Sequence, residues 1–217
     1  MVLSDITIKQ LCTGSCVAEQ REELGDGIAR VSEAIHPMDP GKPMIEPFID
    51  HCVRVDENGN KIVSYGLSSY GYDIRLAPEF KIFAKPNDGR VIDVKNFNED
   101  EICETIKADS IIIPPGGLLL GRTLEYFRIP RNIVVTCLGK STWARVGAIV
   151  HPTPLEPEWE GELVIEITNG TNLPLKIYAH EGIAQLVFEK GDRSCEVSYR
   201  DRGGKYQAQK GVATSRM

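Results

Sequence analysis

The sequence lacks the motifs by which many hydrolytic enzymes hold a metal ion or a nucleophile. None of its four histidines begins an H-x-E motif and no C-x-x-C occurs, so the zinc signature of nucleobase deaminases is missing. G-x-S-x-G is also absent, which gives no support to a nucleophile elbow. We therefore expect any metal ion to arrive with a substrate instead of being held by the protein.

Long apolar runs and an excess of positive charge are missing as well. No stretch of about 18 apolar residues occurs and the chain does not start with a basic segment before an apolar run, so neither membrane insertion nor export is predicted. The formal charge of −6 leaves no basic face for a long nucleic acid. Six cysteines are scattered through 217 residues, a chain long enough to fold without disulfides, which favours reduced thiols in a cytoplasm.

What the sequence does contain is the rhythm of an all-β domain. Short runs of β-branched and aromatic residues alternate with turn signals at residues 57–60, 86–89, 114–117 and 169–170. This spacing predicts a sandwich, a jelly roll or a distorted barrel. The predicted strands are 72–76, 80–83, 110–113, 118–122, 133–138, 163–168, 175–177 and 184–188.

The beginning of the chain has a different character. Ser4 to Leu11 predicts a short helix capped by Ser4, with Ile8, Leu11 and Cys12 on one face. Glycines and prolines between residues 25 and 43 indicate a linker or an ordered arm. We therefore divide the chain into an N-terminal helix and linker arm, residues 1–44, and one domain, residues 45–217, with a flexible C-terminal tail.

The segment 139–145 concentrates groups that can bind an anion. A Walker motif is excluded because Val134 stands where it needs a glycine. Residues 142–150 predict a short helix capped by Ser141 or Thr142, whose free main-chain N–H groups beside Lys140 would form an anion seat. A capped helix with solvated charges is the alternative.

Glu166 is a single carboxylate inside an apolar strand. Alternation places Val164, Glu166 and Thr168 on one face and apolar residues on the other. The carboxylate either lies on the outer surface or faces a pocket, where burial and a nearby arginine would suit it to carry protons. The basic, glycine-containing segment 201–211 is in turn either a frayed end or an arm that closes over phosphates.

Five separated blocks, in this order, resemble the dCTP deaminase family, a branch of the trimeric dUTPase-like β-fold superfamily. The blocks are YGLSSYGYD (65–73), EYFRIPRN (125–132), GKSTWAR (139–145), TPLEPEW (153–159) and DRGGKYQ (201–207). The resemblance covers about residues 45–211. It implies a mainly β, dUTPase-like distorted barrel or jelly roll with few short helices.

The resemblance implies hydrolysis of dCTP to dUTP and ammonia, which supplies dUTP for dUMP and thymidylate synthesis. It implies no catalytic zinc, with Mg²⁺ entering on the triphosphate. Glu166 would be the general acid/base, taking a proton from the attacking water and passing it to the ring nitrogen and the departing amine. Arg145 and Ser141 would orient that water and hold the charged state of Glu166.

The family's nucleotide contacts also map onto this sequence. Lys140 and Thr142 would contact phosphate and the pocket floor, and the main chain at Val164 and Ile165 would read the pyrimidine edge. Glu156 would reach the deoxyribose hydroxyl, while Trp159 would serve packing. The implied substrate-binding residues are Lys140, Ser141, Thr142, Trp143, Ala144, Arg145, Glu156, Val164, Ile165, Glu166, Gln185, Tyr199, Lys205 and Gln209, of which Gln185, Tyr199, Lys205 and Gln209 would hold sugar and triphosphate.

The resemblance also implies a homotrimer with sites at subunit interfaces, and feedback inhibition by dTTP. Two alternative functions stay open. A bifunctional enzyme would also cleave the triphosphate to dUMP and diphosphate, since Tyr72-Asp73 is shared with dUTPases and Glu158 stands where they have a catalytic aspartate. A nucleotide-binding regulator would have no need to retain Glu166 together with Arg145. The sequence departs from the family in the long arm at about residues 17–42 and in Lys140, where many relatives carry arginine.

Overall fold

The computed structural model describes residues 1–23, 29–83, 91–151 and 153–216. Its elements are α1 (Asp5–Cys12), β1 (Gln20–Glu23), β2 (Ala29–Ser32), β3 (Ile45–Glu46), β4 (Cys52–Val55), β5 (Lys61–Ser68), β6 (Gly71–Phe83), the 3-10 turn η1 (Val94–Asn96), α2 (Glu99–Ile102), β7 (Cys103–Lys107), β8 (Ser110–Ile113), β9 (Leu118–Arg128), β10 (Ile133–Gly139), α3 (Ser141–Ala144), β11 (Ala148–Val150), β12 (Pro154–Leu155), β13 (Glu160–Asn169), β14 (Leu175–Tyr178) and β15 (Gly182–Lys190). The predicted turn at 86–89 lies outside the described residues.

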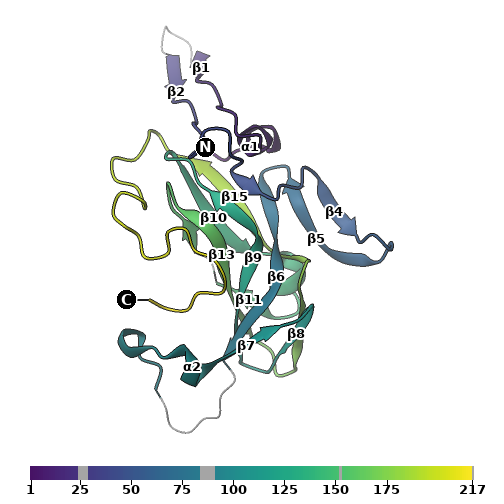
Figure 1. Ribbon diagram of the computed structural model, residues 1–217. Coiled ribbons are helices and arrows are strands. Elements are labelled where there is room, and N and C mark those ends of the chain that lie inside the picture. The colour runs from purple at the N-terminus through teal and green to yellow at the C-terminus, as the bar shows by residue number, and fades with distance from the viewer. Residues whose placement is uncertain (24–28, 84–90, 152, 217) are drawn as a thin grey trace.

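Within these residues, eleven strands form one curled antiparallel sheet. Its main path runs β11-β13-β9-β6-β15-β10-β12, and β3, β4, β5 and β7 join it at the sides. Two smaller ladders, β1 with β2 and β8 with β14, stand apart from it. Figure 1 shows the C-terminal tail running back along the sheet toward α2. The predicted mainly β class with few short helices is confirmed.

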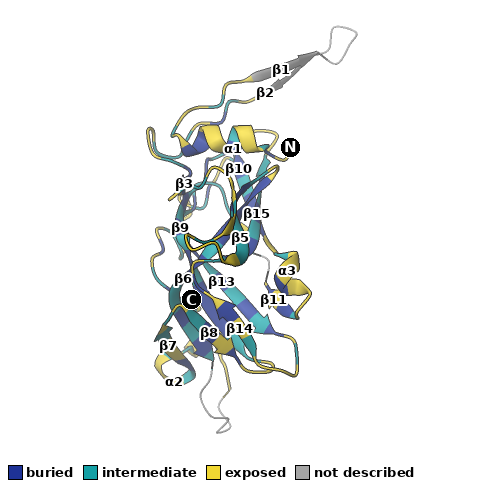
Figure 2. Ribbon diagram, turned by 90° about the vertical axis from the view of Figure 1, so that its right-hand side faces the viewer, coloured by how far each residue is buried: buried dark blue, intermediate teal, exposed yellow. Residues whose placement is uncertain are grey.

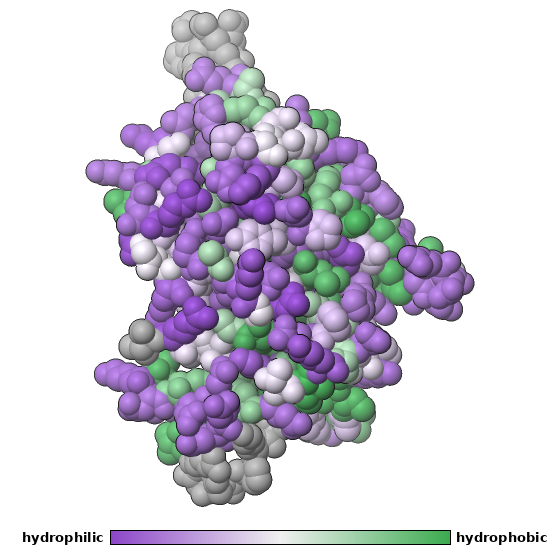
Figure 3. All heavy atoms as spheres, in the orientation of Figure 1, coloured by the Kyte–Doolittle hydropathy of each residue, from purple (hydrophilic) through white to green (hydrophobic). Residues whose placement is uncertain are grey.

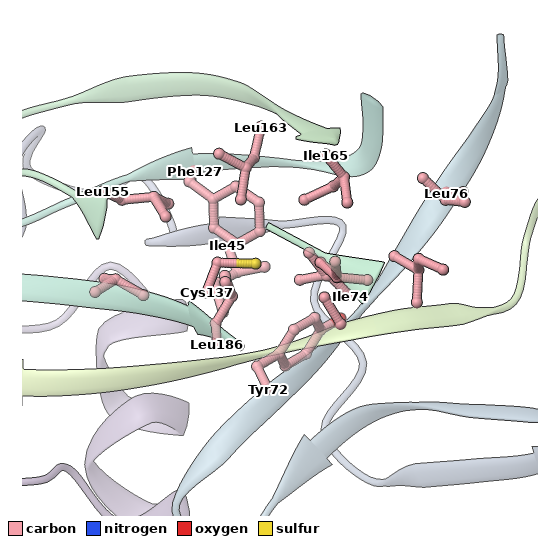
Figure 4. Close-up of a cluster of buried hydrophobic side chains, with 14 of the residues drawn as sticks. Ile45, Tyr72, Ile74, Leu76, Phe127, Cys137, Leu155, Leu163, Ile165 and Leu186 are labelled. Atoms are coloured by element: carbon pink, nitrogen blue, oxygen red, sulfur yellow. The ribbon is translucent and has the colours of Figure 1, made fainter. Parts of the chain in front are cut away.

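The core lies inside the curl of this sheet. Side chains from β6, β9, β10, β13 and β15 meet there, because alternate residues of each strand point inward. Figure 4 shows Tyr72, Phe127 and Ile165 among them, and each is at most 1% exposed. Truncating a buried aromatic such as Phe127 to alanine typically costs about 3–5 kcal/mol. This packing fixes which face of β13 is left for chemistry.

The predicted strands all lie within observed ones, but several boundaries differ. The separate strands predicted at 72–76 and 80–83 are one strand, β6, with a register irregularity between Leu76 and Phe80. Pro78 occupies that irregularity, where its missing N–H interrupts no ladder. The strand predicted at 118–122 continues to Arg128. Strands β1 to β5, β7, β11 and β12 were not predicted, and all of them except β5 span five residues or fewer.

The helix predicted at 142–150 is wrong in length and in its cap. Helix α3 is a single turn that ends at Ala144, and Lys140, not a hydroxyl residue, occupies the N-cap position. Gly147 then turns the chain at φ 81°, and residues 148–150 pair with β13. The β-branched residues here gain more from joining the sheet than the preceding alanines gain from a helix.

The described part of the N-terminal segment contains regular secondary structure. Helix α1 buries Ile8, Leu11 and Cys12 as predicted, although Ser4 makes no side-chain cap hydrogen bond. Beyond it, β1 and β2 pair as a hairpin.

None of the helices in the described part of the chain has the length and apolar character to span a bilayer. The face seen in Figure 3 is predominantly hydrophilic.

Candidate active site

Glu166 lies on β13, whose burial alternates strictly along its length. Odd-numbered residues such as Ile165 and Ile167 are buried in the core, and even-numbered ones such as Val164 and Glu166 are half-buried on the opposite face. The predicted alternation is therefore confirmed. Of the two interpretations of Glu166, the pocket-facing one holds, because this face of β13 lines a cavity of 690 Å³.

The carboxyl group of Glu166 is shielded from water. Burial raises its pKa above the ordinary 4.5, and the nearby His151 opposes that shift. Its Oε2 atom is buried and accepts no hydrogen bond from the described residues. Desolvation favours the protonated form of a carboxyl, and an oxygen without a hydrogen-bond partner is free to meet a ligand, so this group has the features of a candidate general acid/base.

The cavity is large enough for a small-molecule ligand. Its apolar wall consists of Phe83, Ile92, Val94, Phe97, Leu118 and Leu120, and its polar groups come from β13, the loop before it and the C-terminal tail. Six of the predicted substrate-binding residues line it, namely Glu156, Val164, Glu166, Tyr199, Lys205 and Gln209. Ile165 points into the core, so only its main chain could meet a ligand.

The C-terminal tail forms one wall of this cavity. Gln209 is buried, its side-chain amide donates to the carbonyl oxygen of Glu162 at 3.0 Å, and its own carbonyl oxygen accepts from Glu162 N at 2.9 Å. Trp159, buried and packed as predicted, donates its indole N–H to the carbonyl oxygen of Tyr206 at 2.9 Å. The segment from residue 201 onward is thus docked on β13 and is not frayed.

Two carboxylates in the loop before β13 are held by arginines. Arg202 forms an ion pair with Glu156. Arg131 donates to Glu158 Oε2 at 2.6 Å. Glu158 does not line the cavity, so it is poorly placed in this structure to serve as the base of the bifunctional alternative.

The predicted segment 140–145 is not part of this cavity. Arg145 Nη1 donates to Ser141 Oγ at 3.1 Å, and both side chains are exposed together with Thr142 and Ala144. Lys140 forms an ion pair with the buried Asp73. Figure 2 shows α3 on the opposite flank of the molecule from α2 and the C-terminus. Within one chain the predicted site is therefore divided.

Two more predicted residues lie on the α3 side. Trp143 is buried and donates its indole N–H to the carbonyl oxygen of Gly182 at 2.8 Å, so it anchors α3 to β15. Gln185 donates to Ser68 Oγ at 3.3 Å, and its Cα is paired with that of Asp73 across the sheet. Neither residue lines the cavity that holds Glu166.

Some lining residues carry no signal in the sequence. Ala213, Thr214 and Ser215 line the cavity, and Thr214 Oγ1 donates to Glu99 Oε2 at 2.6 Å. Small residues near a chain end predict no site. Phe83 and Phe97 resemble ordinary core residues, and only the fold brings them to the same wall.

A desolvated carboxyl on the wall of a ligand-sized cavity, in a curled antiparallel sheet, is typical of the active site of a β-domain enzyme. Comparison with known proteins narrows this class. A family model described as dCTP deaminase-like matches residues 33–191. The chain belongs to the dCTP deaminase family.

Relatives with this name are similar over most of their length. The dCTP deaminase of Acinetobacter baumannii (strain AYE) is 55% identical over 178 residues, 82% of this chain and 93% of the relative. That of Pseudomonas syringae pv. tomato is 57% identical over 173 residues, 80% of this chain and 90% of the relative.

Solved structures match less of the chain. The 2'-deoxycytidine 5'-triphosphate deaminase from Agrobacterium tumefaciens has a TM-score of 0.47 at 17% identity over 58% of this chain and 39% of that chain. The dUTPase from Streptococcus mutans has a TM-score of 0.41 at 17% identity over 68% of this chain and 94% of that chain. The family assignment therefore rests on the family model and the sequence relatives.

Proposed function

We propose that this chain hydrolyses dCTP to dUTP and ammonia, and so supplies dUTP for dUMP and thymidylate synthesis. The observation that carries the proposal is Glu166, a desolvated carboxyl with a raised pKa and a buried, unsatisfied oxygen on the wall of a nucleotide-sized cavity. The membership of the dCTP deaminase family supplies the substrate. A pure binding protein would gain nothing from a carboxyl that is costly to bury.

In the proposed reaction, Glu166 moves protons and the water supplies oxygen. The carboxylate accepts a proton from the attacking water, whose oxygen bonds to C4 of the pyrimidine, and passes that proton to the ring nitrogen N3. It then carries the proton of the new hydroxyl to the amino group, which leaves as ammonia while the C4 carbonyl forms. A positioned acid/base of this kind contributes ~10²–10⁴-fold to the rate.

Ser141 and Arg145 complete the proposal as the groups that orient the water and stabilise the ionised Glu166. The hydrogen bond of 3.1 Å between them presents a hydroxyl beside a fixed guanidinium fork. Because they lie outside the cavity of their own chain, a second copy must bring them to Glu166. We therefore propose a homotrimer with active sites at the subunit interfaces, since cyclic symmetry repeats one such contact at every interface.

The proposed substrate is the Mg²⁺ complex of dCTP, and no zinc takes part. Lys205 is a cation on the cavity wall that can contact the triphosphate, and Lys140 would add a second from the neighbouring chain. We also propose that dTTP, a pyrimidine triphosphate without the 4-amino group, competes for the same pocket. The cytoplasmic location stays a prediction.

Product analysis tests the proposal directly. The purified protein is incubated with dCTP and Mg²⁺, with and without a chelator that removes zinc and spares Mg²⁺, and the nucleotides are separated by ion exchange. Accumulation of dUTP and ammonia in both samples is the expected result. Formation of dUMP and diphosphate would identify the bifunctional enzyme, and binding without any product would leave a regulator. Adding dTTP to the same assay tests the inhibition.

A further inference from the structure

Arg131, in the turn between β9 and β10, joins segments that are far apart in the sequence. Its Nη1 donates to Glu158 Oε2 at 2.6 Å and its Nη2 to Asp201 Oδ2 at 2.6 Å. Its Nε donates to the carbonyl oxygen of Cys195 at 3.0 Å, and Nη2 also to that of Glu196 at 2.7 Å. One guanidinium therefore holds the loop before β13 and the start of the C-terminal tail together.

The partners of Arg131 are neighbours of residues that line the cavity. Glu158 lies between Glu156 and Trp159, which both line it. Its φ of 60° is a strained conformation for a residue other than glycine, and the bond from Arg131 holds its side chain in place. The loop that carries Glu156 is thus fixed in part from outside the cavity.

On the tail, Asp201 closes a turn around Tyr199. Asp201 Oδ2 accepts from Ser198 N at 3.0 Å, and Ser198 Oγ accepts from Asp201 N at 3.2 Å. The hydrogen bond from Arg131 lowers the pKa of Asp201 to about 2, so this carboxylate is ionised at neutral pH. Tyr199 N then donates to the carbonyl oxygen of Pro157 at 3.0 Å, which ties the turn to the loop before β13.

Tyr199 connects this turn to the rest of the C-terminal tail. Its hydroxyl oxygen accepts from Tyr206 N at 3.0 Å, and Arg202 lies over its ring, 5.3 Å from the centroid. Arg202 in turn forms an ion pair with Glu156. The two cavity residues that would meet sugar and phosphate are therefore linked to each other, and both are linked to the segments that Arg131 holds.

We propose that Arg131 is a positioning residue that sets Tyr199 and Glu156 for nucleotide binding by holding Glu158 and Asp201. Arg131 does not itself line the cavity, so its effect is on binding and not on proton transfer. The planar guanidinium group of Arg131 donates to four acceptor oxygens at once. The ammonium group of a lysine has only three N–H donors and cannot satisfy all four. The nature of the ligand rests on the proposed function, whereas the role in ordering the tail does not.

Four variants test the proposal: Arg131→Met, Arg131→Lys, Asp201→Ala and, as the control, Arg193→Met. Arg193 belongs to the same segment, but its side chain is 81% exposed and pairs only with the adjacent Asp192 among the described residues. Asp201→Ala removes a single partner of Arg131 at a half-exposed site, so it is informative even where Arg131→Met does not fold. Steady-state kinetics with dCTP separates KM from kcat.

Arg131→Met is expected to raise KM about 10-fold or more and to change kcat by less than about 3-fold, because ground-state and transition-state binding weaken equally. Asp201→Ala and Arg131→Lys are expected to shift KM in the same direction by less, and Arg193→Met to change neither constant. An equal fall of kcat and kcat/KM in the Arg131 variants, or an unchanged KM in Arg131→Met or in Asp201→Ala, would overturn the proposal.

A second measurement needs no activity. Hydrogen exchange of the nucleotide-free protein reports the order of residues 198–209, and Arg131→Met and Asp201→Ala are expected to exchange there faster than wild type, while β6 and β9 keep their protection. Unchanged exchange in residues 198–209 would overturn the clamp even in an active enzyme. If wild type fails to deaminate dCTP, the proposed function fails, and the exchange result still decides the role of Arg131.

Discussion

The main-chain nitrogen of His151 donates a hydrogen bond of 3.0 Å to the carbonyl oxygen of Glu166. The imidazole of the same histidine reaches along β13, with Nε2 2.9 Å from Thr168 Oγ1. His151 thus follows β11 against the strand that carries Glu166, and its electrostatic interaction with Glu166 opposes the effect of burial on the pKa of that carboxyl. The strand that carries the proposed acid/base is therefore held by β11 at the edge of the sheet.

Glu166→Gln is expected to lower turnover of dCTP by at least about 10²–10⁴-fold while nucleotide binding is retained, because the amide keeps the shape of the side chain and cannot exchange a proton. Product formation and calorimetric binding of dCTP are the measurements. Glu57→Gln, at an exposed turn, is the control and should match wild type. Normal turnover in the Glu166 variant would remove Glu166 from the mechanism.

The raised pKa of Glu166 also predicts how stability depends on pH. Above the unfolded-state value near 4.5, the folded protein binds more protons than the unfolded chain, so this group makes the free energy of unfolding fall as pH rises toward the folded-state pKa. Glu166→Gln lacks this contribution. The free energy of unfolding of Glu166→Gln should therefore rise relative to that of wild type as pH increases from below 4.5 to neutral. Denaturant titrations at a series of pH values check this, and a parallel pH dependence in both proteins would contradict it.

Mixing two inactive variants tests whether the site is shared between chains. Arg145→Ala lacks one half of the proposed site and Glu166→Gln the other, so each alone should be inactive. After co-refolding in equal amounts, about a quarter of the interface sites in random trimers would combine an intact Glu166 with an intact Arg145. Recovery of activity toward that fraction is expected. Mixed oligomers without any recovery would mean that each chain completes its own site.

Gly203 and Gly204 form a matched pair in the tail. A Cβ at Gly204 would lie 2.1 Å from Cε1 of Tyr199, whereas one at Gly203 would meet nothing within 4 Å, although φ there is 62°. Each alanine variant should lose stability by about 1–2 kcal/mol, from overpacking at Gly204 and from backbone strain at Gly203. KM for dCTP should rise only in Gly204→Ala, because Tyr199 must move. Equal KM values in the two variants would argue against a binding role for Tyr199.

Strands with strong local signals could be predicted from the sequence, and those without could not. The run 133–138 is apolar and β-branched, and it forms β10 almost as predicted. In contrast, β4 and β7 are short and largely exposed, so no run of buried hydrophobic residues marks them. Residues 142–150 show the opposite error, since local helix propensity was overridden when 148–150 paired with β13.

The candidate site shows the same division. The isolated carboxylate of Glu166, the strand alternation and the matching blocks are visible in the sequence, and they indicated the family and Glu166 as the candidate acid/base. The closing of the wall by residues 213–215 and the joining of three segments by Arg131 depend on contacts between residues 27 to 115 positions apart. The position of residues 140–145 away from the cavity is likewise a result of the fold. No local pattern encodes such contacts.

The sequence by itself determined the β class, the inward and outward faces of β13 and the family, because each depends on residue types at short, regular spacing. Only the tertiary structure decided that Glu166 faces a cavity, that its carboxyl is desolvated and that one chain does not bring Arg145 to it. The burial of a side chain, the pKa of its carboxyl and the lining of a cavity all depend on which segments surround them. Those surroundings exist only once distant segments have packed together.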